Sequence, residues 1–250
     1  MSLFTSNNPT LKEEAFTQAA LPQTLADAKP MTLNGTIGKT ALLVGIVVVF
    51  AVFAWDLFSL MGVPLPFLIS IPLVGVALAF LITFKKHLAP YVAPIYCALQ
   101  GLFLGGVSGI LEMKFPGIAN QAMLLTFTVF GGMLLLYSTR VIRATDRFKS
   151  IIITATFGIF CYYMAAFVLQ FFGVEMALIH SSGTAGIIFS VFVVILAAMN
   201  LILDFDTIEQ GVAHGAPKTM EWYAAFGLVV TLIWLYVEIL RLLSKLYSRD

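Results

Sequence analysis

The sequence predicts an all-α, polytopic membrane protein built as a bundle of seven transmembrane helices. Hydrophobic residues make up 60% of its 250 residues and charged residues only 11%, whereas soluble domains carry roughly 25% charged residues. The mean hydropathy is +0.97. The apolar residues also fall into seven runs, each near the roughly 20 residues that a helix needs to cross the hydrocarbon core.

The seven runs are bounded by charged residues, proline or glycine, and short connections between them leave no room for another soluble domain. We therefore expect residues 39–250 to form the transmembrane domain and residues 1–38 a polar N-terminal tail in the cytoplasm. The tail lacks the apolar segment of a signal peptide, and Thr10–Ala26 is a candidate amphipathic helix within it. The expected spans are Lys39–Phe58, Pro66–Phe84, Pro90–Leu111, Gln121–Thr139, Ser150–Phe172, Gly183–Thr207 and Met220–Leu246.

The lysines and arginines indicate how the bundle is oriented. Most of them fall on one side, which should be cytoplasmic because cytoplasmic loops are enriched in these residues. These residues are Lys12, Lys29, Lys39, Lys85, Lys86, Arg140, Arg143, Arg147, Lys149 and Lys218. An odd number of spans puts a smaller group of lysines and arginines, at the end of the chain, on the opposite side. We expect the larger group to determine the orientation. The net charge of +1 favours no nucleic-acid partner.

Glycine, proline and cysteine residues predict how the spans pack. In the third span a stripe of glycines, one per turn, should let a neighbouring helix approach closely; they are Gly101, Gly105 and Gly109. Pro72 should bend the second span, whereas Pro94 is expected in the first turn of the third, where proline is tolerated. Cys97 and Cys161 lie in apolar runs, so we expect both to be buried hydrophobic residues rather than a disulfide or metal pair.

Carboxylates inside the last two spans are the candidate functional residues. A charged Asp or Glu at membrane depth costs about 2.5 kcal/mol or more unless it faces a cavity, pairs or takes up a proton. Asp204 and Asp206 lie in the sixth span, where Asp206 shares a helical face with Glu209 and Asp204 does not. The alternative is that all three are interfacial residues reached by water.

A second layer of acids is expected at the opposite face of the membrane. Glu238 should lie roughly 28 Å along the seventh span, near the level of Glu112 and Asp56 at the ends of two other spans. Two acidic layers joined by apolar helices would suit the entrance and exit of a cation path. For Glu238 the alternative is a local pair with Arg241, three residues later.

Three enzyme or receptor classes fit poorly. Ser108 lies in a GxSG motif typical of intramembrane serine proteases, but His214, its possible base, is expected at the other side of the membrane. A metal enzyme would need clustered ligands, whereas the three histidines are scattered over different loops. A retinal-type receptor needs a mid-span lysine, and Lys245 lies at the end of the chain. We therefore expect no catalytic activity.

The segments LDFDTI (residues 203–208) and WLYVEILRLL (residues 234–243) resemble the Bax-inhibitor family of seven-helix membrane proteins. In that family, FDTQ-like and LYLDF-like motifs mark the sixth and seventh helices. The resemblance covers roughly residues 31–246 and includes the pattern from Pro90 to Gly105. SNNP near the start and GAPKTMEWYAAFGL before the last helix are similar to the bacterial branch, which implies a bacterial inner-membrane location.

The resemblance implies a pH-sensitive calcium leak without a cofactor, in which two acids of the sixth and seventh helices share a proton and bind calcium transiently. Asp206 and Glu238 match these acids, with Glu in place of the usual Asp. The chain departs from the family pattern in two ways. The pair is 32 residues apart, longer than in better-known members, so an ungapped alignment places Val230 or Thr231 opposite Asp206. The arginine that latches the sixth-helix acid in some relatives has no counterpart in the second span.

Two functions therefore remain open. The first is a proton-gated cation leak, because close carboxylates in a low dielectric favour protonation and calcium prefers oxygen ligands. The second is a non-conducting regulator that binds other membrane proteins, such as a protease or a cell-death factor. Acid-to-amide substitution separates them, since only the leak should lose a pH response.

Overall fold

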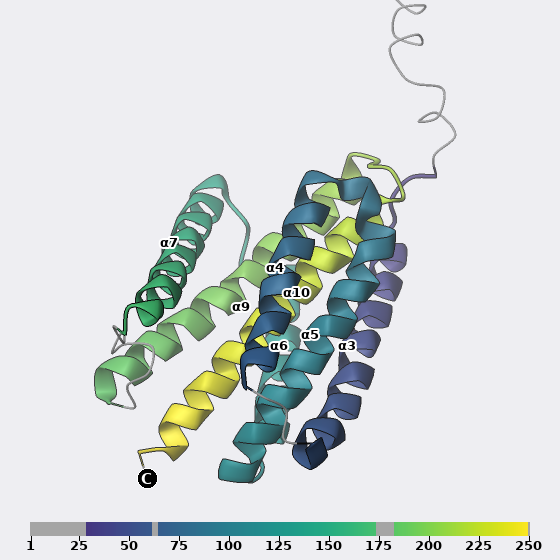
Figure 1. The fold of residues 1–250 in the computed structure, drawn as a ribbon. Coiled ribbons are helices and arrows are strands. Elements are labelled where there is room, and N and C mark those ends of the chain that lie inside the picture. The colour runs from purple at the N-terminus through teal and green to yellow at the C-terminus, as the bar shows by residue number, and fades with distance from the viewer. Residues whose placement is uncertain (1–28, 62–64, 174–182, 250) are drawn as a thin grey trace, which may run out of the picture.

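The computed structural model describes residues 29–61, 65–173 and 183–249, and it confirms the expected all-α membrane bundle. Six helices are long and apolar enough to cross a membrane, and α4 has 20 residues. The candidate amphipathic helix lies outside the described residues. The helices are α3 (Leu33–Met61), α4 (Leu65–Phe84), α5 (Ala89–Lys114), α6 (Ile118–Ser138), α7 (Asp146–Phe171), α9 (Thr184–Ala213) and α10 (Met220–Tyr247), with a 3-10 turn, η2 (Lys86–Leu88), before α5 (Figure 1).

Several helices begin or end at other residues than the sequence predicts. Helix α3 begins at Leu33, next to the contact of Thr32 with Glu221, and α9 continues to Ala213, past Glu209, which pairs with Arg140. Pro94 is the sixth residue of α5 rather than part of its first turn. The helix begins just before Pro90, so Pro90 takes the N-terminal position that tolerates proline.

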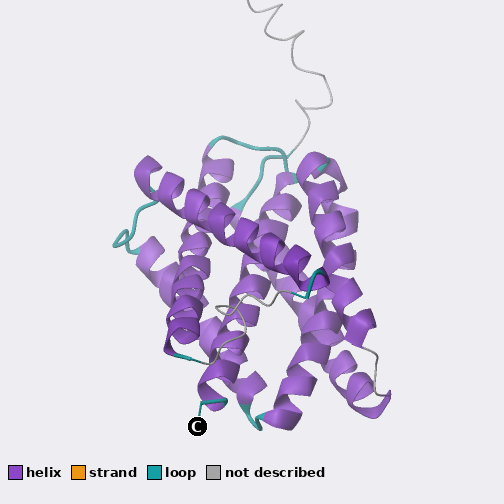
Figure 2. Ribbon diagram, turned by 60° about the vertical axis from the view of Figure 1, so that its left-hand side comes forward, coloured by secondary structure: helices purple, strands orange, loops and turns teal. Residues whose placement is uncertain are grey.

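Helix α10 is the centre of the bundle. It packs against α9, α3, α6 and α5 (Figure 1); Figure 2 shows the helical bundle from another side. Its side chains Val229, Leu235 and Leu240 are almost completely buried and join two hydrophobic clusters, one shared with α6 and α9 and the other with α3, α4 and α5. Polar groups on α10 are therefore surrounded largely by protein rather than by lipid.

The glycine stripe of α5 packs against α3, as predicted. A Cβ atom at Gly101 would lie 2.5 Å from the carbonyl oxygen of Val47, and one at Gly105 only 2.1 Å from that of Ala51. At Gly109 the nearest atom would be 3.8 Å away. The two backbones thus touch along the first two glycines and separate toward the third.

Gly105→Ala should lower the free energy of unfolding by about 2 kcal/mol, because overpacking forces the backbones of α3 and α5 apart. Thermal unfolding of the purified protein in detergent measures this. Gly131→Ala is the matched control, since a Cβ atom there meets nothing within 4 Å and alanine favours a helix. Equal melting temperatures for the two variants would contradict the close packing.

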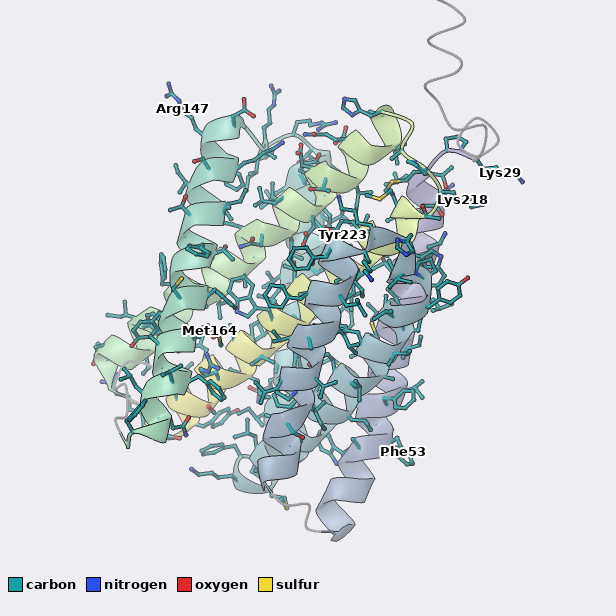
Figure 3. The ribbon with its side chains drawn as sticks, turned by 45° about the horizontal axis from the view of Figure 1, so that its top comes forward. Lys29, Phe53, Arg147, Met164, Lys218 and Tyr223 are labelled. Atoms are coloured by element: carbon teal, nitrogen blue, oxygen red, sulfur yellow. The ribbon has the colours of Figure 1, made fainter. Side chains whose placement is uncertain are left out.

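Two segments that are far apart in the sequence pair through their backbones at one end of the bundle. At the upper end in Figure 1, the segment Lys29–Met31 pairs with the connection Ala216–Lys218 through Met31 N to Ala216 O at 2.7 Å and Lys218 N to Lys29 O at 3.0 Å. Figure 3 shows Lys29, Lys218 and Arg147 at this end. The C-terminus lies at the lower end. The cytoplasmic location of the upper end stays a prediction.

The two cysteines lie in different surroundings. Cys97 is buried, as expected, but Cys161 is exposed. The prediction for Cys161 was wrong because α7 lies at the edge of the bundle, packs mainly against α9 and turns its other faces outward.

Candidate functional site

Asp206 binds α7 at the upper end. Its Oδ2 atom lies 2.5 Å from Nζ of Lys149 and accepts a hydrogen bond of 2.6 Å from Gln210, one turn later on α9. Lys149 lies in the first turns of α7, which Thr145 caps by accepting a hydrogen bond from the backbone of Phe148. The cation that holds this acid thus comes from the fifth span instead of the second.

Glu209 lies beside Asp206 but binds a different element. Both of its carboxylate oxygens accept hydrogen bonds from Arg140, in the connection after α6, and Oε2 also accepts one from the hydroxyl of Tyr137. The hydrogen bond to Glu209 raises the pKa of Arg140 above its usual value. Because the pair is about half exposed, it resembles the interfacial alternative more than a buried switch.

Asp204 faces the central helix. Its side chain lies against Gly227, where a Cβ atom would be 4.0 Å from Oδ1, and beside Thr231. Its Oδ2 atom is buried and has no hydrogen-bond partner in the part of the chain that the structure describes. An ionised carboxylate with an unpaired oxygen is costly in a low dielectric. Of the two residues that an ungapped alignment places opposite Asp206, Val230 and Thr231, the second lies next to Asp204.

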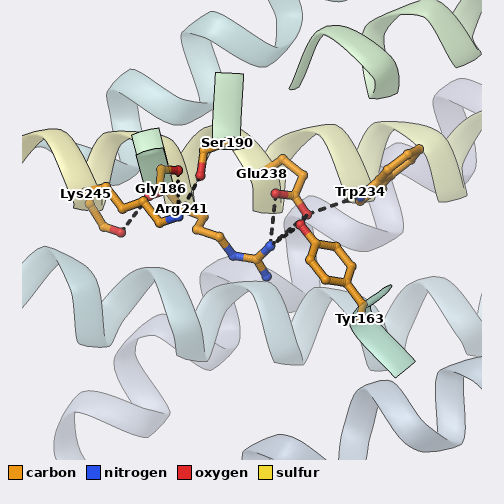
Figure 4. Close-up of polar contacts among 8 residues, drawn as sticks. Tyr163, Gly186, Ser190, Trp234, Glu238, Arg241 and Lys245 are labelled. Carbon is orange, nitrogen blue, oxygen red and sulfur yellow. Dashed lines mark hydrogen bonds and ion pairs between the residues drawn. The ribbon is translucent and has the colours of Figure 1, made fainter. Parts of the chain in front are cut away.

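Glu238 is 1% exposed and lies in a cluster of polar groups at the lower half of α10 (Figure 4). Nη1 of Arg241 lies 3.0 Å from both of its oxygens, so the local pair exists. The hydroxyl of Tyr163 on α7 also donates to Oε1 at 3.0 Å, and Nε1 of Trp234 does so at 3.3 Å. Glu238 thus faces protein and binds α7 as well as its own helix.

Lys245 continues this polar line toward the C-terminus. It is 4% exposed, and its Nζ donates to the carbonyl of Gly186 at 3.0 Å and to Oγ of Ser190 at 2.9 Å (Figure 4). These contacts join the last turns of α10 to the first turns of α9.

The remaining predicted acids have other roles or surroundings. Glu112 accepts hydrogen bonds from the backbone N of Gly117 at 2.6 Å and of Ala119 at 3.1 Å, so it caps the N-terminus of α6. The side chain of Asp56 lies outside the described part of the structure. Glu112 is therefore part of the turn between α5 and α6, and its contacts explain its position without a pore.

The structure does not bring Asp206 and Glu238 together. Counted along the helices at 1.5 Å per residue, Asp206 lies roughly 10 Å, Asp204 roughly 14 Å and Glu238 roughly 27 Å from the upper ends of their helices. Each acid also has its own partners. This arrangement therefore does not support a proton shared between the two acids or a calcium ion that touches both at once.

Both acids are instead joined to α7. Between their contacts, Thr156 accepts a hydrogen bond of 2.8 Å from Asn200 of α9. The residues that face the bundle repeat every seven positions, with polar side chains alternating with buried isoleucines. We call them the α7 seam: Lys149, Ile152, Thr156, Ile159 and Tyr163. Sequence reasoning missed this seam, although the seven-residue repeat was visible.

The enzyme classes gain no support from the geometry. Oγ of Ser108 lies 2.7 Å from the hydroxyl of Tyr236, and Nδ1 of His214 lies 2.7 Å from the carbonyl of Gln210, on a different helix. Among the described residues, no three His, Cys, Asp or Glu side chains are grouped as metal ligands.

Comparison with known proteins agrees with the motifs in the last two spans. No curated protein and no solved structure gave a significant match to the chain. The sequence profile described as Bax inhibitor 1 like matches residues 7–248. Since this match covers nearly the whole chain and the bundle has the expected helices, the protein belongs to the Bax inhibitor 1 like family.

Proposed function

We propose that the protein is a pH-sensitive cation leak of a bacterial inner membrane, with its N-terminus in the cytoplasm, and that α7 is the element that moves. One observation carries this proposal: the two acids that match the family motifs, Asp206 and Glu238, both bind α7. Calcium is the favoured cation because it prefers carboxylate and carbonyl oxygens.

Protonation would loosen α7 at two levels. The ionised carboxylate of Asp206 holds Lys149 near the upper end, and that of Glu238 accepts from Tyr163 in the lower half. Hydrogen bonds to charged groups contribute about 1.5 kcal/mol or more, and this contribution is lost when the carboxylate takes up a proton. We therefore expect cation flux to rise on acidification.

Asp204 supplies oxygens between these two levels. It lies on the other side of α9 from the α7 seam, against Thr231 and Gly227 of α10. Its unpaired oxygen is suited to a passing cation because a cation would replace the missing partner. Asp206, Asp204 and Glu238 then mark successive positions along α9 and α10 rather than one shared site.

Calcium flux into liposomes that contain the purified protein tests the proposal. We expect flux to be higher at about pH 5 than at about pH 8, because a protonated carboxyl group binds its partner on α7 less strongly than a carboxylate does. Asp206→Asn imitates the protonated acid, so its flux at the higher pH should increase about tenfold, the change that a lost contact of about 1.4 kcal/mol produces.

Glu209→Gln is the matched control, because Glu209 lies on the same helix face but binds Arg140 and Tyr137 instead of α7. It should keep the wild-type pH profile. If Asp206→Asn also keeps it, the switch is not at the α7 seam. If the wild-type protein carries no cation at any pH, the leak is excluded and the non-conducting regulator is the better account.

A further inference from the structure

A cavity of about 340 Å³ lies between α3, α5, α6 and α10, away from the α7 seam. Its walls are almost entirely apolar and include Val44, Val48, Leu104, Phe127 and Ile233. Helices α3 and α6 form its two sides. Helices α5 and α10 form its floor, and each of them contacts both α3 and α6. None of the proposed gating contacts uses this space.

The cavity has the length of one membrane leaflet. On α3 its wall runs from Val44, near the middle of the helix, to Trp55, near the lower end. This stretch is about 16 Å long, close to half of the roughly 30 Å hydrocarbon core. The cavity therefore reaches from the membrane surface at the lower end to about the bilayer centre.

Polar groups gather at the end of the cavity nearest the membrane surface. Trp55, Asn120 and the hydrogen-bonded pair Ser108 and Tyr236 line this end. Toward the bilayer centre the lining is mostly apolar, as at Val44, and the hydroxyl of its polar residue Thr126 donates to the carbonyl of Ala122 within α6. Tryptophan and tyrosine prefer the level of lipid headgroups, so the lining has the same polarity gradient as a phospholipid.

The mouth of the cavity opens sideways between α3 and α6. The lining residues Val48, Val52, Met123 and Phe127 are 38%, 62%, 43% and 47% exposed. In a spanning bundle, such exposed apolar side chains face lipid. A lipid chain can thus enter from the bilayer without passing through water.

We propose that this cavity binds one acyl chain of a membrane phospholipid from the leaflet at the lower end. One acyl chain spans one leaflet, which is about half of the roughly 30 Å hydrocarbon core, so the cavity matches a single chain in length. The polar lining lies where the ester groups of that lipid would lie.

Quenching of Trp55 by a phospholipid with brominated acyl chains tests the site directly. A Trp222→Phe, Trp234→Phe protein keeps only Trp55, which lines the cavity. In detergent, quenching should saturate at a small lipid excess, with one lipid per protein. Val48→Phe fills the mouth and should raise the half-saturating lipid concentration at least about tenfold, whereas Val49→Phe, next to it but outside the lining, should not change it.

Two results would overturn the proposal. Quenching that rises linearly with lipid and is the same in all variants would show only contact with bulk lipid. Tighter saturation by a brominated free fatty acid than by the phospholipid would identify another ligand. Because two tryptophans are replaced in this protein, native mass spectrometry of the otherwise unchanged chain provides a second measurement. It should show one retained phospholipid, lost in Val48→Phe and kept in Val49→Phe, and an equal lipid count in both variants would also contradict the site.

Discussion

Replacing Glu221 with alanine should lower the free energy of unfolding by about 3 kcal/mol, the usual cost of leaving one member of a buried ion pair without its partner. The side chain of Glu221 is 0% exposed, and it pairs with Lys39 of α3. It also accepts hydrogen bonds from the backbone N and the hydroxyl of Thr32, at 2.9 and 3.0 Å. Chemical or thermal unfolding in detergent micelles measures the loss.

Two further variants separate charge from packing at this cluster. Lys39→Met combined with Glu221→Leu removes both charges together, so it should destabilise less than Glu221→Ala alone. Gly35→Ala should destabilise without changing any charge, because a Cβ atom there would lie 2.3 Å from Oε1 of Glu221. Wild-type stability of Glu221→Ala would mean that the cluster does not hold α3 to α10.

The second large effect is expected for Glu238→Ala, which should detach the lower half of α7 from α10. Glu238 is almost fully buried, and its loss removes the acceptor for Tyr163 and leaves Arg241 without its carboxylate. Breaking such a pair costs about 3 kcal/mol or more, concentrated on a helix that packs mainly against one neighbour. Amide hydrogen exchange should accelerate at least about tenfold in the second half of α7.

The exchange experiment has an internal and an external reference. Amides of α3 and α5, which pack backbone to backbone at Gly101 and Gly105, should keep their rates. Ser244→Ala, one turn after Arg241, removes a hydrogen bond that stays within α10 and should leave α7 unchanged. An equal acceleration over all helices would show general destabilisation instead of a local release.

The spans and the glycine contact were predictable from the sequence because both follow from local patterns. Apolar run length decides a span, and Gly101 and Gly105 repeat at one helical turn. Glu238 and Asp206 stood out for the same reason, as acids inside apolar runs. Such signals need no knowledge of which helices are neighbours.

The partners of these acids were not predictable by the same means. Lys149 was counted only toward membrane orientation, yet it binds Asp206. Tyr163 carried no signal of its own, and its contact with Glu238 depends on α7 lying beside α9. Asp204 faces Thr231 because of the relative rotation of α9 and α10. Contacts between helices depend on rotation and tilt, which hydropathy does not record.

The pairing of Lys29–Met31 with Ala216–Lys218 couples the start of the described chain mechanically to the central helix, α10. The two backbone hydrogen bonds at this junction lie just before Glu221, and α10 carries Glu238 toward its other end. Force or binding applied to the residues before Lys29 therefore acts first on the connection between α9 and α10. A fusion at the N-terminus should include a spacer before Lys29, because a rigid fusion there would transmit force to α10, the helix that binds α7 through Glu238.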